Sequence, residues 1–280
     1  MLLALFVALA ALIAACGEKE ESTTTSGATS LADCQADSLD TLKSGTLTVA
    51  TDKPAYPPYF EDNDPTNGEG FESAVAYAIA DQLGFSSDQV EWTVEPFNSS
   101  YAPGPKDFDF DVNQISINEK RAEAVDFSSP YYTADQAVVA LKDSDLTGIS
   151  STGDLADARI GVQIGTTSLD AVEASIEPND DPQVFDTSND VVTALKQGQV
   201  DAIVVDVPTA FYLTAVQVPD AAIVGQFSAP GGDEWGALLQ KDSPLTDCVS
   251  AAVSALDASG ELAKIQERWI NAGGGVATLE

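Results

Sequence analysis

One arginine lies at the start of a predicted helix, in a position suited to binding a carboxylate. Asn118 is a good N-cap residue, and the three charged helix formers that follow it end at Arg121. The free N–H groups of a helix start and the helix dipole attract an anion to the same place. A guanidinium can also bind a carboxylate through two parallel hydrogen bonds, and the chain has only two other arginines, Arg159 and Arg268. The spacing therefore predicts a carboxylate-binding role for Arg121, with a solvated helix-end arginine as the structural alternative.

Two further polar positions follow predicted strands. Gly165-Thr166-Thr167-Ser168 offers hydroxyl and N–H groups after the strand predicted at 159–163, as a second anion cradle or simply a capped helix start. Asp206 directly follows the apolar run 202–205, at the carboxyl end of a strand, where open α/β sheets bind ligands. There it can accept hydrogen bonds from an ammonium group, or it can cap the turn before Pro208.

These groups are complementary to the carboxylate and ammonium of an α-amino acid, which form charge-assisted hydrogen bonds. Four aromatic residues are candidates for the wall of a side-chain pocket, although aromatic residues also serve as ordinary core: Tyr56, Tyr59, Phe97 and Tyr101.

The elements expected to position these residues alternate between strand and helix. Strands are predicted at 46–51, 90–94, 108–117, 138–141, 159–163 and 202–205, and helices at 71–83 and 190–197. The first helix has apolar Val75, Ile79 and Leu83 spaced by four and ends at Gly84. Such alternation predicts an α/β fold with a mainly parallel sheet covered on both faces.

The composition narrows the function. A formal net charge of −33 opposes binding to nucleic acid or to an anionic lipid surface, because both require a positive face. The chain has no histidine, which removes the commonest general base and the commonest zinc ligand. We therefore expect neither an enzyme nor a resident cofactor or metal.

The N-terminal region reads as an export signal. Residues 1–15 are apolar, too short to span a membrane, and end in small residues before Cys16. This pattern predicts a lipoprotein signal peptide over 1–16 with Cys16 lipidated, a buried structural thiol being the alternative. The first residues lack the usual positive charge, so we expect the start to be truncated or misassigned. A polar tether is expected over 17–38.

The other two cysteines, Cys34 and Cys248, belong to a chain that is expected to be exported. Acylation of Cys16 leaves no other thiol, so they are predicted to form a disulfide. Two unpaired buried cysteines are the alternative.

Several segments together resemble the polar amino acid ABC transporter solute-binding proteins, which are bacterial extracellular solute-binding proteins of family 3. They are Tyr56-Pro57-Pro58-Tyr59, Gly70-Phe71-Glu72, 116–121, Asp126 to Tyr132, Gly161 to Thr167 and 260–269. The resemblance implies a two-lobed periplasmic-binding-protein-like fold of type II, with two crossovers and the ligand cleft between the lobes. Lobe 1 would comprise 39–134 plus 228–280, and lobe 2 would comprise 135–227. Both Cys34 and Cys248 would then fall in the first lobe.

The same resemblance assigns roles at the cleft. Arg121 and Ser116 resemble the carboxylate-binding pair, and Thr167 resembles the residue that reaches the carboxylate from the second lobe. Asp206 matches the ammonium acceptor. The remaining expected ligand contacts are Tyr56, Phe97, Gln114, Asp52 and Lys53. Because Lys53 lies near a position where relatives with cationic ligands carry an acid, an acidic or neutral polar amino acid is favoured.

The resemblance further implies a lipid-anchored receptor on the outer face of the membrane, or in the periplasm. It would close on its ligand like a hinge and deliver it to an ABC permease, and we expect a monomer. One alternative is a dehydratase-like enzyme on the same fold, with Asp206 and Glu234 as the available acids. Another is the binding module of a sensor system.

Overall fold

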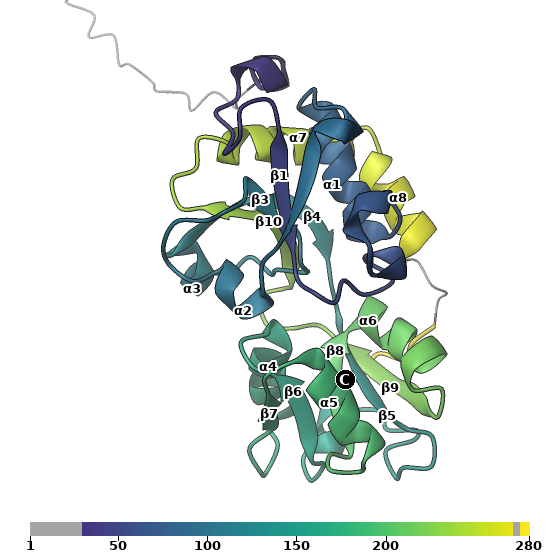
Figure 1. Ribbon diagram of the computed structural model, residues 1–280. Coiled ribbons are helices and arrows are strands. Elements are labelled where there is room, and N and C mark those ends of the chain that lie inside the picture. The colour runs from purple at the N-terminus through teal and green to yellow at the C-terminus, as the bar shows by residue number, and fades with distance from the viewer. Residues whose placement is uncertain (1–29, 271–274) are drawn as a thin grey trace, which may run out of the picture.

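The computed structural model describes residues 30–270 and 275–280. In this part the chain forms two lobes, each built around a five-stranded sheet (Figure 1). The predicted signal peptide 1–16, its Cys16 and most of the predicted tether lie outside the described residues. Within the described ranges, no helix has the length and apolar character needed to cross a membrane.

The first sheet has the strand order β2-β1-β3-β10-β4. The strands are β1 Leu47–Thr51, β2 Val90–Val94, β3 Phe110–Asp111, β4 Val125–Thr133 and β10 Glu234–Gln240. β1 pairs in parallel with β2 and β3, whereas β10 runs antiparallel to β3 and β4.

The helices of the first lobe include the one predicted most clearly from the sequence. They are α1 Phe71–Gln82, α2 Phe97–Ser100, α3 Glu119–Ala122, α7 Thr246–Ala258 and α8 Glu261–Trp269. The three apolar residues spaced by four, Val75, Ile79 and Leu83, are fully buried in the core with α7. Burial contributes about 1.5–3 kcal/mol for each such side chain. Gly84 follows with φ +81°, so it is the left-handed residue that ends the helix, as predicted.

The second sheet has the order β7-β6-β8-β5-β9. Its strands are β5 Gln136–Leu141, β6 Ile160–Gln163, β7 Gln183–Phe185, β8 Ala202–Asp206 and β9 Ala221–Phe227. Its helices are α4 Thr167–Ala171, α5 Ser188–Lys196 and α6 Val207–Tyr212, and π-helical turns extend α4 and α6. β6 pairs in parallel with β7 and β8, whereas β5 is antiparallel to β8 and β9.

The expectation of a mainly parallel sheet is wrong, because each sheet is mixed. The antiparallel pairings all involve β5 or β10, and each of these strands starts just after the chain has crossed from the other lobe. The strand expected over 108–117 is also shorter than predicted. It ends at Asp111, and Gln114 adopts φ +49°, which takes the chain out of the sheet and toward the other lobe.

Two short crossovers connect the lobes. Ala134 and Asp135 join β4 to β5, and residues 228–233 join β9 to β10. The Ala134 N–H donates to the carbonyl of Asp233 over 2.8 Å, so the two crossovers are bonded to each other. In Figure 1, β4 runs down from the upper lobe to this junction.

The predicted disulfide is confirmed. Cys34 and Cys248 are bonded, with Cα atoms 5.4 Å apart and a sequence separation of 214. The bond fixes the start of the described chain to α7. Residues Leu31–Asp33 and Ala36–Ser38 form short 3₁₀ turns here, so this end of the predicted tether is part of the first lobe.

The end of the chain packs on the second lobe, not the first. Thr278 bridges Gln226 of β9 in parallel, and Leu279 is buried in the second lobe's core. The backbone of Glu280 exchanges hydrogen bonds with Ser150 and Thr152. We therefore propose that lobe 2 contains 135–227 and the end of the chain, and that lobe 1 contains 39–134 and 228–270 together with the disulfide-bonded segment before it.

Candidate ligand-binding cleft

A cavity of about 100 Å³ lies between the lobes. The first lobe contributes the end of β1, the loop after it, α2 and the segment after β3. The second lobe contributes the ends of β6 and β8 and the starts of α4, α5 and α6. The lining residues are Thr51, Asp52, Pro54, Ala55, Tyr56, Phe60, Phe97, Asn113, Gln114, Gln163, Thr166, Ser168, Ser188, Val191, Val204, Val205, Asp206 and Thr209. Carboxyl ends of parallel strands thus face the cavity from both sheets, which is where α/β sheets bind ligands.

The side chains predicted to contact the ligand fall into three groups. Those that line the cavity are Asp52, Tyr56, Phe97, Gln114 and Asp206. Arg121, Ser116 and Thr167 are linked by hydrogen bonds beside it, and the Arg121 guanidinium lies over the ring of the lining residue Phe97. Lys53 is exposed and is not part of the lining.

Arg121 is held in place from both lobes. The Asn118 side chain accepts the Arg121 N–H over 2.8 Å, which confirms the predicted N-cap. The guanidinium donates to the carbonyl of Ser116 at 2.7 Å and to the carbonyl of Gly165, from the second lobe, at 2.9 Å. It also lies over the ring of Tyr101, 4.7 Å from its centroid. Arg121 is therefore 94% buried and keeps a positive charge at the junction of the lobes.

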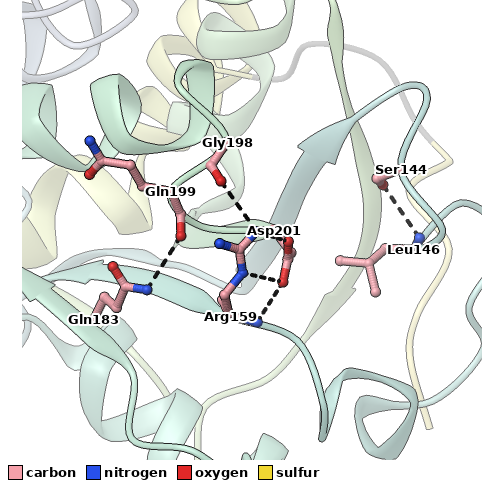
Figure 2. A network of polar contacts seen from close by, with 7 residues as sticks. All are labelled: Ser144, Leu146, Arg159, Gln183, Gly198, Gln199 and Asp201. Atoms are coloured by element: carbon pink, nitrogen blue, oxygen red, sulfur yellow. Dashed lines mark hydrogen bonds and ion pairs between the residues drawn. The ribbon is translucent and has the colours of Figure 1, made fainter.

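The other arginine with a clear partner serves a different purpose. Arg159 binds Asp201 through Nε at 3.0 Å and Nη2 at 2.5 Å, and it also donates to the carbonyl of Gly198 (Figure 2). These residues precede β6 and β8, so the ion pair lies at the opposite end of those strands from the cleft. Arg159 thus stabilises strand ends and is not positioned to contact a ligand.

A chain of hydroxyl groups connects the lobes beside Arg121. The hydroxyls of Ser116 and Thr167 are 3.1 Å apart, and the Thr167 hydroxyl donates to Asp233 Oδ2 over 3.0 Å. Asp233 is 1% exposed, and its Oδ1 has no hydrogen-bond partner among the described residues. The predicted carboxylate-binding hydroxyls are therefore close together, but that of Thr167 already donates to Asp233, a carboxylate that was not predicted from the sequence.

Asp206 and Asp233 share one amide group. Gln136 is fully buried, and its Nε2 donates to Asp206 Oδ1 at 2.8 Å and to Asp233 Oδ2 at 2.7 Å. Ser168 donates to Gln136 Oε1 over 2.6 Å, which fixes the orientation of the amide. Burial and then the neighbouring Asp233 raise the pKa of Asp206 well above its usual value. Burial also raises the pKa of Asp233, against the effect of its hydrogen bonds.

The first-lobe wall depends on a second buried acid. Glu72 in α1 accepts hydrogen bonds from the Gln114 N–H at 2.6 Å, from the Gln114 side chain and from the Tyr131 hydroxyl at 2.5 Å. Burial raises the pKa of Glu72 to about 7. These bonds hold Gln114 in its left-handed conformation and turn its side chain into the cavity wall.

The aromatic residues divide between wall and contact between lobes. Tyr56 and Phe97 line the cavity, as predicted. Tyr59 is instead buried, and its hydroxyl bonds that of Thr209 in α6 over 2.8 Å. Asp52 Oδ2 accepts the Phe97 N–H at 3.4 Å, which positions α2 against the cavity.

Three site residues were missed by the sequence analysis: Gln136, Gly165 as a carbonyl acceptor, and Asp233. Gln136 and Asp233 lie at the two crossovers, which carry no local motif. The sequence signal at the second crossover was an acidic pair before an apolar run. Glu234 of this pair was considered as a possible enzyme acid, but it is exposed. Its neighbour Asp233 is the buried one.

The fold and the cleft define a two-lobed binding protein whose small-molecule site lies between two α/β lobes. The chain belongs to the bacterial extracellular solute-binding proteins, family 3, whose family model matches residues 47–272.

Characterised relatives and solved structures agree with this assignment. The arginine-binding extracellular protein ArtP of Bacillus subtilis strain 168 is 29% identical over 221 residues, which is 75% of this chain and 81% of ArtP. The L-cystine-binding protein TcyJ of Escherichia coli strain K12 is 28% identical over 232 residues, 81% of this chain and 84% of TcyJ. An ancestral arginine-binding protein bound to arginine is 33% identical with a TM-score of 0.65, over 80% of this chain and 98% of that protein.

Proposed function

We propose that this protein is an extracytoplasmic receptor that captures a free amino acid in the cleft by hinge closure and delivers it to an ABC permease. The observation that carries the proposal is the placement of Asp206 in a cavity between the lobes, with the buried Arg121 beside the same cavity. Asp206 is an anionic hydrogen-bond acceptor and Arg121 is a cationic donor. Placed apart in this way, they match the ammonium and the carboxylate of an α-amino acid.

In the proposed complex, the ligand carboxylate binds Arg121, Ser116 and Thr167, and the ligand ammonium binds Asp206. Asp206 has one carboxylate oxygen bonded to Gln136, which leaves the other for the ammonium. Tyr56, Phe97 and Gln114 would contact the ligand side chain. Each charge-assisted bond contributes about 1.5–3 kcal/mol in a site from which water is excluded.

Closure is supported by bonds that already cross between the lobes. Arg121 reaches the Gly165 carbonyl, Ser116 meets Thr167, and Tyr59 meets Thr209. A ligand bridging Arg121 and Asp206 adds to these bonds only when the lobes are closed, so its binding energy favours the closed form. The permease would then recognise that form.

For the ligand side chain we propose a neutral polar group. The sequence argument for an acidic or neutral ligand rests on Lys53, but this lysine lies outside the cavity lining. The lining instead contains the carboxylates of Asp52 and Asp206 with several amides and hydroxyls. Carboxylates repel an acidic side chain, and amides and hydroxyls bind a neutral polar one.

The geometry favours binding over catalysis. The two acids considered for an enzyme do not lie together, because Asp206 lines the cavity whereas Glu234 is exposed at the start of β10. One solved neighbour, 30% identical with a TM-score of 0.65, is an ancestral amino acid-binding protein described as a precursor of cyclohexadienyl dehydratase. We propose that this chain retains the binding role.

We also propose that Cys16 is lipidated and anchors the receptor to the outer face of the membrane. The family is extracellular, and the disulfide between Cys34 and Cys248 fits an oxidising compartment. Metabolic labelling with a radioactive fatty acid should mark the wild-type protein and not Cys16→Ser.

A thermal-shift screen of the twenty amino acids, followed by calorimetry, tests the function. One or a few amino acids should raise the melting temperature, bind with one-to-one stoichiometry and be recovered unchanged. No shift with any of them would refute the amino-acid receptor, and chemical conversion of a bound amino acid would favour the enzyme.

A further inference from the structure

Asp233 is placed where a charged side chain is normally avoided. It is the last residue of the second crossover, 1% exposed, and its backbone carbonyl is bonded to Ala134 of the first crossover. One carboxylate oxygen has no hydrogen-bond partner among the described residues. Leaving a buried carboxylate oxygen unbonded is costly, so this arrangement is unlike an optimised structural contact.

The bonded oxygen of Asp233 uses the donors that a ligand carboxylate would need. The Thr167 hydroxyl has a single proton and donates it to Asp233 Oδ2 over 3.0 Å. The Ser116 hydroxyl lies 3.1 Å from that of Thr167 and donates its own proton to it, so both protons are committed while Thr167 is bonded to Asp233. An incoming carboxylate cannot share these protons while that bond persists.

We propose, on the basis of the proposed function, that Asp233 competes with the ligand from within the protein. Its carboxylate occupies the subsite of the ligand carboxylate and closes the empty cleft. An amino acid must displace it from Thr167 before the ligand-bound closed form is complete. Asp233 thereby sets both the affinity of the receptor and the population of closed molecules without ligand.

The surrounding groups allow such an exchange. Gln136 Nε2 bonds both Asp233 and Asp206, so Asp206 retains its bond and its position when Asp233 leaves. Arg121 attracts either carboxylate, and its guanidinium donates to two backbone carbonyls, so among the described residues it does not hold Asp233 through an ion pair of its own. The neighbouring Asp206 repels Asp233, which favours its release.

The decisive experiment compares Asp233→Asn with wild-type protein by calorimetry. The probes are L-glutamine, L-arginine, L-glutamate and L-cystine. Asparagine has nearly the same shape but no charge, so it competes weakly for the Thr167 hydroxyl. We expect the dissociation constant of any probe that binds wild type to fall about tenfold or more, equivalent to about 1.4 kcal/mol. Glu234→Gln is the matched control, because it removes one negative charge from the neighbouring residue, which is exposed. The affinity of this variant should equal that of wild type.

A second readout does not involve the ligand. Small-angle X-ray scattering of amino-acid-free protein should give a larger radius of gyration for Asp233→Asn than for wild type, because the bond to Thr167 no longer closes the cleft. Glu234→Gln should match wild type. If Asp233→Asn does not fold, as judged by circular dichroism, Asp233→Ser serves in its place with the same expectations.

The outcomes separate this inference from the proposed function. Unchanged or weaker binding by both Asp233 variants overturns the inference; weaker binding would mean that Asp233 contacts the ligand ammonium. If no probe and none of the other standard amino acids binds any form of the protein, the receptor function and the inference both fail.

Discussion

Ligand binding should depend most on Arg121 and Asp206, two residues that carry opposite charges. Arg121 is buried between the two lobes, and Asp206 lies at the end of β8, in the cavity wall. Sequence reasoning identified both, because a helix cap and a strand end are local patterns. It did not identify Asp233 or Gln136, since their neighbours are set by how the crossovers fold together.

Replacing Arg121 should remove the carboxylate site. We expect Arg121→Ala to weaken amino acid binding by about 100-fold or more, from the loss of charge-assisted bonds of about 3 kcal/mol. Calorimetry with the best amino acid of the screen measures the loss. Arg159→Ala is the matched control, because its ion pair with Asp201 (Figure 2) lies at the opposite end of β6 and β8 from the cleft. Equal affinity in both variants would contradict the role of Arg121.

The ammonium site makes a separate prediction. Asp206→Asn should weaken binding of an amino acid by about tenfold to 100-fold, because the variant retains the shape of the side chain but loses its charge. Binding of the corresponding compound without the amino group should change little. Parallel losses for both compounds would indicate structural damage instead.

The raised pKa of Glu72 predicts how the stability of the protein depends on pH. Burial raises its pKa from 4.5 to about 7, so between these values the folded protein holds a proton that the unfolded chain has released. Stability due to this group is therefore complete below pH 4.5 and declines as the pH rises to about 7, by about 3 kcal/mol at most. Urea unfolding at pH 5 and pH 8 should show a smaller decline for Glu72→Gln. An identical decline in wild type and variant would count against the buried acid.

At the scale of elements, the turns that carry the site matter more than the strands that support them. The sequence predicts the β6 and β8 strands closely, and it places Thr167 at the start of α4. It overextends the strand around β3 and misses the mixed direction of both sheets. Strand direction depends on the path between lobes, which leaves no periodic pattern in the residues.

The turn before α4 offers a test of closure. Gly165 has φ +75°, and a Cβ there would lie 2.4 Å from the Tyr101 hydroxyl of the opposite lobe. We expect Gly165→Ala to weaken amino acid binding about tenfold, because the added methyl group separates the lobes. Gly198→Ala controls for backbone strain, since Gly198 has φ +67° and an added Cβ would have open space. If the two variants bind alike, closeness of the lobes at this turn is not limiting.

At the scale of the whole molecule, the lobes differ in how they are fastened. The first lobe carries the disulfide between Cys34 and Cys248, which closes a loop of more than 200 residues. The second lobe receives the end of the chain instead. The two-lobed fold follows from the sequence through the resemblance, whereas the position of the chain end does not, because Thr278 and Leu279 follow a run of glycines and belong to a stretch too short to show strand periodicity.

Loss of the disulfide should affect stability and spare the site. Cys34→Ser/Cys248→Ser should lower the free energy of unfolding by roughly 2–5 kcal/mol. Its affinity for amino acids should remain that of wild type, because both cysteines belong to the first lobe. Chemical unfolding and calorimetry measure the two quantities, and reductant should reproduce the variant. A large loss of affinity would show that the disulfide also orients the cleft.

The pairing of the chain end with β9 means that the polypeptide passes between the lobes three times, twice through the crossovers and once before Thr278. The described end of the chain, residues 275–280, therefore moves with the second lobe, whereas α8 belongs to the first. An interdye distance between α8 and α5 would report the opening of the lobes. A fluorophore or affinity tag is better fused before residue 30 than after Glu280, whose backbone is hydrogen-bonded to Ser150 and Thr152.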